Sequence, residues 1–172
     1  MVPVIETERL RLRGHEMRDF EASAAMWADP EVRRFIGGAP STREDSWGRF
    51  LRYVGHWQAL GFGFWVVEQK SDGRFVGEVG FADFKREMTP GFGDEPEQGW
   101  ALASWAHGKG FATEAVLAAL DWGDKTFKSD CVCMIDAGNA ASIGVAQKAG
   151  YQRYALGNYK DKEVGLYRRQ RA

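Results

Sequence analysis

Residues 106–115 read AHGKGFATEA, and this short segment organises the interpretation of the whole chain. Gly108 and Gly110 flank a lysine, and a run of residues with helical spacing follows at once. The first amides of a helix have no partner within the helix, and the helix dipole favours negative charge beside them. Glycine allows a ligand to approach the backbone closely and tolerates positive φ angles. The segment therefore predicts a site for a phosphate group.

Two common phosphate motifs do not fit this segment. A Walker P-loop needs a glycine five residues before Gly108 and Ser or Thr after the lysine, yet Ala103 and Gly110 stand there. A dinucleotide fingerprint needs a glycine where Thr113 stands, within an opening βαβ unit that the chain lacks. A glycine-rich connection without a ligand stays open as the alternative.

The periodicity of apolar residues on either side of this segment alternates between strand and helix. Ser71-Asp72-Gly73 is a strong hairpin signal, and residues 86–97 form a loop with glycine and proline. The pattern predicts an α+β fold with one mixed sheet and helices on both faces. Strands are expected at 9–13, 62–69, 74–84, 98–104, 131–137, 151–156 and 163–169, and helices at 17–27, 32–36, from Ser41 or Thr42 to Gly61, 110–127 and 139–150.

Length and composition limit the class of protein. The 172 residues suit a single domain, 1–172, and 44% hydrophobic residues are enough to build a core. A net charge of −1 provides no overall positive field for nucleic acid or an anionic membrane, so any anion site must be local. The start of the chain does not resemble a secretory signal, and no segment has 18 uninterrupted apolar residues. We expect a cytoplasmic protein.

The cysteines and histidines do not indicate a metal site. Cys131 and Cys133 alternate in CVCMI and are expected to lie buried on one face of a strand as small hydrophobic residues. His15 and His56 have no carboxylate or second histidine at ligand spacing, so we expect surface or satisfied side chains.

Two motifs in this chain resemble signatures of the GNAT superfamily of N-acetyltransferases. HGKGFA is similar to Q/R-x-x-G-x-G/A, with His107, Gly110 and Ala112 in the three places. NAASIGVAQKAGY is similar to the second signature, N-x-x-S-x-x-V-x-x-K-x-G-[FY], over residues 139–151. The opening ETERLRLR, WADPEVRRFIGG and EQGWALASWAHGKGFATEA look like the RimJ/RimL subgroup of ribosomal-protein N-terminal acetyltransferases. The resemblance covers essentially the whole chain and implies the acyl-CoA N-acyltransferase (GNAT) fold, with a mostly antiparallel central sheet.

This resemblance implies acetyl-CoA as the donor substrate, without a metal. The main chain of Trp100, Ala101 and Leu102 would pair with the pantetheine arm like an added strand. Asn139 would reach the pantetheine or the acetyl end. His107 departs from the usual Gln or Arg and removes a permanent charge. The pyrophosphate would be held by the backbone of His107, Gly108, Lys109, Gly110, Phe111, Ala112 and Thr113.

Acetyl transfer to an amine needs a neutral amine, and a general base or a positioned water helps to provide it at neutral pH. Glu97 is the candidate base, and a solvated glutamate at a strand entrance is the alternative. Many members use a tyrosine seven residues after the Asn to protonate the leaving thiolate, but this chain has Ala146. Ser142 is the substitute candidate as acid and CoA contact, with a local capping role as the alternative; Tyr151 is expected in the core.

These expectations combine into one function and one alternative. The resemblance implies an N-acetyltransferase that transfers acetyl from acetyl-CoA to a primary amine, a protein N-terminus or a small molecule, by direct attack in a ternary complex. The alternative is a non-catalytic acyl-CoA-binding or partner-binding module on the same fold. The sequence does not identify the acceptor, because acceptor loops such as 37–46 and 86–97 vary freely on one fold. The oligomeric state is open, and homodimers are common in the superfamily.

Overall fold

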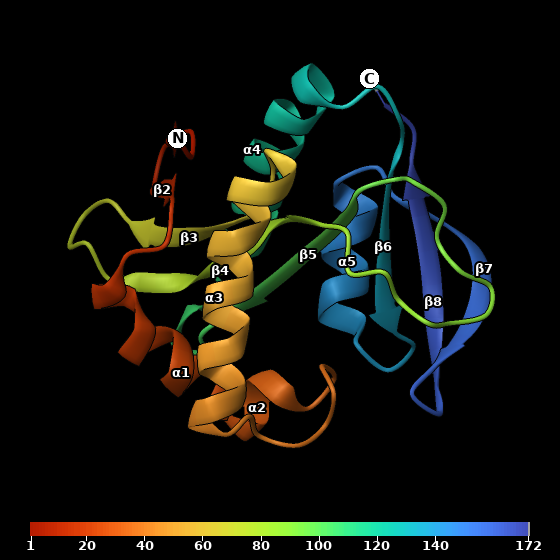
Figure 1. Ribbon diagram of the computed structural model, residues 1–172, viewed down its shortest axis with the longest axis horizontal. Coiled ribbons are helices and arrows are strands. Elements are labelled where there is room, and N and C mark those ends of the chain that lie inside the picture. The colour runs from red at the N-terminus through yellow and green to blue at the C-terminus, as the bar shows by residue number, and fades with distance from the viewer. Residues whose placement is uncertain (172) are drawn as a thin grey trace.

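The computed structural model describes residues 1–171, through which a single eight-stranded sheet runs (Figure 1). Its strand order is β1-β2-β3-β4-β5-β6-β8-β7, and β5 beside β6 is its parallel pair. The strands are β1 (Ile5–Glu6), β2 (Leu10–Arg13), β3 (Phe64–Gln69), β4 (Phe75–Ala82), β5 (Glu97–Leu102), β6 (Cys131–Asp136), β7 (Gln152–Tyr159) and β8 (Lys162–Arg169).

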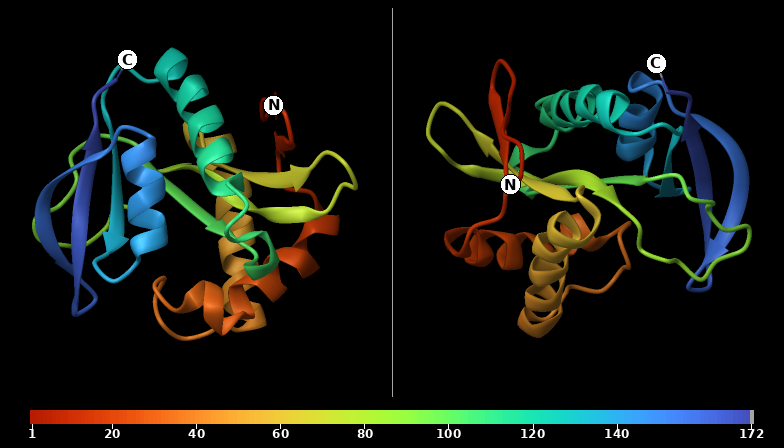
Figure 2. Two further views of the ribbon diagram at one scale, coloured as in Figure 1. Left: turned by 180° about the vertical axis from the view of Figure 1, so that it is seen from behind. Right: turned by 45° about the horizontal axis from the view of Figure 1, so that its top comes forward.

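The helices cover both faces of this sheet, which confirms the predicted α+β architecture. Figure 2 shows α1, α2 and α3 on one face and α4 and α5 on the other. The helices are α1 (Phe20–Ala28), α2 (Pro30–Arg33), α3 (Arg43–Leu60), α4 (Phe111–Thr126) and α5 (Ala140–Lys148), with short 3-10 helices η1 (Met17–Asp19) and η2 (Ser104–Ala106). Within residues 1–171, no helix is both long and apolar enough to cross a membrane.

The boundaries of α3 follow from its terminal residues. Thr42 accepts a hydrogen bond from the Asp45 amide at 3.1 Å, and the Asp45 carboxylate accepts one from the Thr42 amide at 3.0 Å. This capping box satisfies free amides at the helix start, so Thr42 rather than Ser41 begins the helix. Gly61, with φ of +75°, ends it where the sequence predicted.

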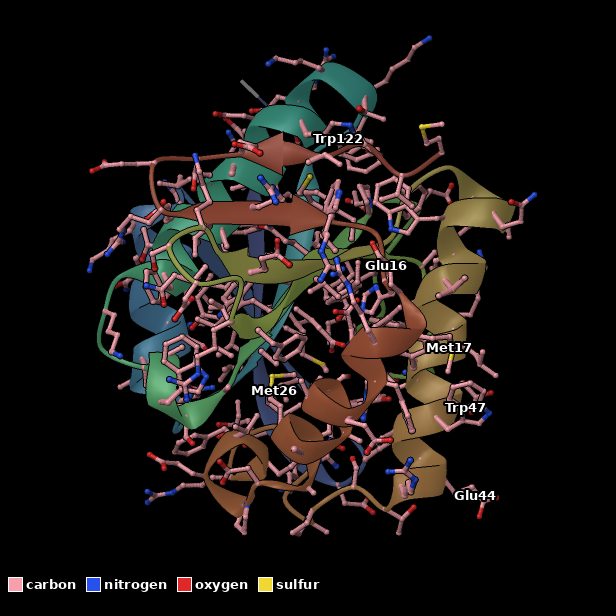
Figure 3. The ribbon with its side chains drawn as sticks, turned by 90° about the vertical axis from the view of Figure 1, so that its left-hand side faces the viewer. Glu16, Met17, Met26, Glu44, Trp47 and Trp122 are labelled. Carbon is pink, nitrogen blue, oxygen red and sulfur yellow. The ribbon has the colours of Figure 1, made fainter. Side chains whose placement is uncertain are left out.

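Aromatic side chains fill much of the core between the sheet and its helices. Trp65 of β3 is fully buried and packs edge-to-face on Trp57 of α3 and Trp122 of α4, with ring centroids 4.8 and 5.1 Å apart. Figure 3 shows Met26 pointing inward from α1 and Trp47 pointing outward from α3. Trp47 is accordingly 37% exposed, whereas Met26 is buried.

Four local features differ from the predicted elements. The helix predicted at 32–36 is α2 at Pro30–Arg33, because Pro30 suits the first helical position and the Asp29 side chain accepts a hydrogen bond from the Glu31 amide. The short strand β1 was not predicted, because two residues are too few for a periodic signal. The strand predicted to reach Ser104 ends at Leu102, and the 3-10 helix η2 replaces its last residues. Strand β7 extends to Tyr159, beyond the predicted end at 156, because it pairs with β8 up to their hairpin.

Candidate functional site

The glycine turn before α4 has the conformation that the sequence predicted. Gly108 and Gly110 have φ angles of +72° and +79°, in the left-handed region where glycine is favoured. Gly110 is the N-cap of α4 and offers no side chain to the helix start. The amides of residues 108–113 have no hydrogen-bond partner in the part of the chain that the structure describes. Residues 107–110 are exposed, so these amides are open to an anion.

Cationic side chains from distant segments surround this turn. Arg9 donates a hydrogen bond to the Lys109 carbonyl at 2.9 Å, and its guanidinium lies 4.6 Å from the centre of the Phe111 ring. Arg74 and Lys109 lie over Trp105, with their charged groups 3.8 and 4.8 Å from the ring centroid. Sequence reasoning missed Arg9 and Arg74, because no local pattern links the first strand or the β3–β4 hairpin to this turn.

Strands β5 and β6 diverge beside the turn. Their pairing has a single register pair, Glu97 with Val132. The Ala103 amide donates to the Val76 carbonyl of β4, whereas the Pro96 carbonyl accepts from the Val132 amide of β6. Main-chain groups of successive strand residues point alternately to the two sides. The N–H and C=O of residues 98, 100 and 102 therefore face the gap between β5 and β6.

This alternation determines which neighbouring strand each of the three residues predicted to contact pantetheine faces with its main chain. Trp100 turns both of its main-chain polar groups to the gap, and Ala101 turns its own to β4. The Leu102 carbonyl also faces the gap and accepts a hydrogen bond from His107 Nε2 at 2.9 Å. Because a carbonyl can only accept, His107 carries its hydrogen on Nε2. The imidazole is thus turned back on β5.

A cavity of about 560 Å³ occupies the gap and continues to the face that carries α2 and α3; we name it the splay cavity. It brings together Glu97, Trp100, Ala101, Asn139 and Ser142 from the predicted site. Leu102 and residues 107–113 do not line it, so the glycine turn is a separate part of the site. Trp27 and Phe35 also line it.

Glu97 is buried at the start of β5, with 6% of the residue exposed. Its two carboxylate oxygens accept hydrogen bonds from Arg86 Nε and Nη2 at 2.6 and 2.7 Å. Such a two-point pair stabilises the ionised carboxylate and fixes its orientation. The predicted alternative of a solvated glutamate does not describe this residue.

Asn139 and Ser142 meet at the start of α5. The Asn139 side chain caps the helix by accepting a hydrogen bond from the Ser142 amide at 3.1 Å. Ser142 thus takes part in the helix cap, as the predicted alternative had it, but through its backbone amide and not through its hydroxyl. Its hydroxyl has no hydrogen-bond partner within residues 1–171 and is free to contact a ligand.

The other titratable groups near the gap are structural. The Tyr151 hydroxyl donates to Gln98 Oε1 at 2.7 Å, and burial raises the pKa of Tyr151 well above its usual value. Burial also raises the pKa of Cys131 to about 12 and that of Cys133 well above its usual value. The predicted core positions of Tyr151, Cys131 and Cys133 are confirmed.

Comparisons with known proteins give a consistent result. Residues 9–152 match the acetyltransferase (GNAT) domain. The uncharacterized protein YkkB of Bacillus subtilis is 30% identical over 167 residues, which cover 95% of this chain and 93% of the relative. An acetyltransferase from Agrobacterium tumefaciens superposes with a TM-score of 0.84 at 30% identity, with 98% of this chain and 94% of that chain covered.

A third similarity concerns the predicted subgroup. RimL, a ribosomal L7/L12 alpha-N-protein acetyltransferase solved in complex with coenzyme A, superposes with a TM-score of 0.79 over 98% of both chains. The identity is 14%, so the similarity shows a common fold alone. The RimJ/RimL subgroup therefore stays a prediction.

Proposed function

The chain belongs to the GNAT acetyltransferase family, and from this premise we propose that it is an N-acetyltransferase that moves the acetyl group of acetyl-CoA to a primary amine. The observation that carries the proposal is the row of unpartnered amides at residues 108–113, beside a gap in the sheet that opens into a cavity. An anion-binding helix start and a free strand edge suit the two ends of a phosphopantetheine chain.

The donor fits this arrangement along its length. The amides between His107 and Thr113 bind the pyrophosphate, and the cation of Lys109 adds attraction, whereas the charge of Arg9 is paired with Glu114. The N–H and C=O of Trp100 pair with the amide groups of the pantetheine arm. Asn139 stands at the far side of the gap, where it borders the acetyl end. Bound acetyl-CoA supplies the activated acetyl group.

Glu97 serves as the base through a water molecule. Both of its oxygens are engaged by Arg86, but each carboxylate oxygen can accept a second hydrogen bond. A water held by Glu97 accepts a proton from the acceptor ammonium, which exposes the nitrogen lone pair for attack on the thioester carbonyl. The oxyanion that forms needs a hydrogen-bond donor, and a backbone amide of β5 that faces the gap is suited to supply it.

Ser142 protonates the leaving thiolate, and its hydroxyl regains a proton from the amine nitrogen, which loses one as the amide forms. Its hydroxyl lines the splay cavity and has no other partner within the described residues. Ala146 is fully buried where many relatives place a tyrosine, so no second hydroxyl is available at that position. The products are an acetylated amine and coenzyme A, formed in one ternary complex without a covalent enzyme intermediate.

We propose a cytoplasmic location as well, with no nucleic acid or membrane as partner. The local character of the charged clusters and the net charge of −1 support this part of the proposal. Dimerisation is not needed for the site as described, because each of its parts comes from one chain.

Release of the coenzyme A thiol tests the function. The protein is mixed with acetyl-CoA and a panel of amino acids, N-terminal peptides and polyamines, and thiol is measured over time. We expect steady release with at least one acceptor and an acetylated product of matching mass. If acetyl-CoA raises the thermal stability of the protein but no acceptor leads to thiol release, the protein is the non-catalytic acyl-CoA-binding module and not an enzyme.

A further inference from the structure

The part of the splay cavity that α2, α3 and the β7–β8 hairpin line is strongly cationic. We name five of its lining side chains the cationic wall. They come from α2, α3 and the β7–β8 hairpin, and are Arg33, Arg49, Arg52, Lys160 and Lys162. Within residues 1–171, none of the five forms a salt bridge with a carboxylate.

The acidic residues that line the same cavity are already engaged. Glu97 is paired with Arg86. Asp83 lies 2.7 Å from Lys85 Nζ, and one oxygen of Asp136 accepts a hydrogen bond from the Gly138 amide. The Gly138 amide is neutral and leaves the charge of Asp136 in place, so among the described residues the cavity lining holds one carboxylate without a cationic partner against the five cations of the cationic wall.

Backbone geometry holds two of these cations in place. Arg33 Nε donates to the Ala39 carbonyl at 2.7 Å. Gly37 and Gly38 have φ angles of +80° and +81°, and a Cβ on Gly37 would come within 2.5 Å of Arg33 Nη2. A Cβ on Gly38 would lie 3.1 Å from Lys162 Nζ. The two glycines thus leave room for one guanidinium and one ammonium group at the cavity edge.

Arg49 is positioned by an aromatic ring. Its guanidinium lies 3.9 Å from the centre of the Trp27 ring, and Trp27 Nε1 donates to the buried Glu78 at 2.8 Å. Burial and the nearby charge of Arg49 together lower the pKa of Arg33. The charge of Asp45 acts on Arg33 in the opposite direction, without an ion pair between the two. Like charges held together are unfavourable, and a bound anion would reduce that cost.

The anion is not the phosphate of the donor. The glycine turn does not line the splay cavity, and α4 lies on the opposite face of the sheet from α2 and α3 (Figure 2). Asn139 and Ser142 mark the donor end of the cavity, so the cationic wall borders the acceptor end.

Resting on the function proposed above, we propose that the acceptor is an amine that also carries a carboxylate, and that the cationic wall binds this carboxylate. Guanidinium groups match a carboxylate in shape and charge. Two sources share this chemistry: a free amino acid and a peptide whose first residues are acidic. A polyamine would be repelled from the same surface.

Matched acceptors test the proposal directly. The compounds 4-aminobutyrate, butylamine and putrescine share a four-carbon chain but end in a carboxylate, a methyl group and an ammonium group. We expect kcat/KM to be at least about tenfold higher for the carboxylate than for butylamine, and lowest for putrescine. The preference should shrink as salt screens the charges. Equal rates, or a preference for putrescine, would overturn it.

A second pair of acceptors separates the two sources. Free L-aspartate is compared with C-terminally amidated Asp-Ala-Ala. The asparagine counterpart of the first is L-asparaginamide, which carries no carboxylate, and that of the second is amidated Asn-Ala-Ala. Preference for free aspartate identifies a free amino acid as the source, and preference for the amidated acidic peptide identifies a protein N-terminus. An asparagine compound that matches its aspartate partner in both arms would contradict the proposal.

Variants locate the effect on the cationic wall. Arg49→Gln and Arg52→Gln should each raise KM for 4-aminobutyrate several-fold and reduce the preference over butylamine. Arg52 is exposed, so its replacement does not threaten folding. Arg43→Gln is the control, since Arg43 lies on the same helix but pairs with Glu21 outside the cavity. A similar loss of preference in Arg43→Gln would point to general electrostatics and against the cationic wall.

Binding without turnover keeps this inference separate from the proposed function. If no amine is acetylated, the enzyme proposal fails, and calorimetry with glutarate then tests the wall alone. In protein saturated with coenzyme A at constant ionic strength, glutarate should bind at one site, and Arg49→Gln should weaken that binding. Spermidine binding in place of glutarate, or no heat with glutarate, would refute the cationic wall as an anion site.

Discussion

Glu78 holds a negative charge at the centre of the sheet, where it has no exposed surface. It accepts hydrogen bonds from Ser23 Oγ at 2.7 Å and Trp27 Nε1 at 2.8 Å, and lies 3.1 Å from His15 Nε2. Burial raises the pKa of Glu78, but the contacts with His15, Ser23 and Trp27 outweigh it and the pKa is lowered. The same carboxylate orients the indole on which Arg49 rests.

Replacement of Glu78 should therefore be costly. In Glu78→Gln the amide nitrogen cannot accept from Ser23 or Trp27, and His15 loses its charged partner. We expect the free energy of unfolding in urea to fall by about 3 kcal/mol. Glu44→Gln is the control, because Glu44 points to solvent from the start of α3 (Figure 3). Equal stability of the two variants would show that the buried contacts contribute little.

Ser142 is the residue whose chemical role is easiest to isolate. Since a thiolate is a fair leaving group, Ser142→Ala should lower kcat about tenfold and leave the affinity for coenzyme A nearly unchanged. Thiol release measures kcat, and calorimetry measures the affinity. The exposed Ser71→Ala in the β3–β4 hairpin serves as control. If both variants turn over like the parent protein, the hydroxyl of Ser142 has no part in protonation.

At the scale of elements, the start of α4 makes the sharpest prediction. Gly110→Ala and Gly73→Ala both place a side chain where φ is positive, +79° and +70°, and each should lose roughly 1–2 kcal/mol of stability. Gly73 lies in the β3–β4 hairpin, where an added Cβ meets no atom within 4 Å. Gly110→Ala alone should also weaken coenzyme A binding in calorimetry, by about tenfold. Equal affinities of the two variants for coenzyme A would show that the turn at Gly110 does not bind this ligand.

Local sequence signals predicted the elements well because each is short-range. Helical spacing, the Thr42 capping box and the Ser71-Asp72-Gly73 turn act over a few residues, and the structure confirms the elements that they predicted. The pairing of β8 with β6, which places β7 at the edge, depends on contacts between distant segments. Periodicity carries no information on such pairing.

The residues of the candidate site also fall into two groups, those that a local motif predicts and those that it does not. The positions of the glycine turn, Asn139 and Ser142 followed from motifs within one segment. The Arg86 partner of Glu97 and the cationic wall did not, because those side chains meet only when separate segments fold together. His15 was expected to be at the surface or satisfied; it is fully buried against Glu78, a partner 63 residues away.

At the scale of the whole molecule, buried and paired carboxylates set the response to acid. The pKa of Glu78 is lowered from 4.5 and that of Asp19 from 3.8. Burial raises the pKa of Asp19, but the contacts with Arg13 outweigh this effect. Each contributes stability that is present above its unfolded pKa and is lost as pH falls through the lower folded value. Urea unfolding should therefore show constant stability near pH 6 and a decline below about pH 4.5. Stability that rises between pH 4.5 and 3 would contradict this assignment.

We propose that the two substrates reach the splay cavity from different sides of one sheet. In this proposal the donor lies along the turn and the gap between β5 and β6, and the acceptor meets the cationic wall beneath α2 and α3. A net charge of −1 is compatible with binding of anionic groups, because cations without a salt bridge among the described residues gather locally in the cationic wall.

Amide NMR of the 15N-labelled protein during titration with coenzyme A tests the central claim most directly, since it observes the backbone groups that we propose bind the pyrophosphate. We predict that the amide signals of residues 108–113 shift further than any others and saturate at one equivalent. Signals of these residues that stay in place, while coenzyme A saturates another part of the chain or binds nowhere, would contradict the account.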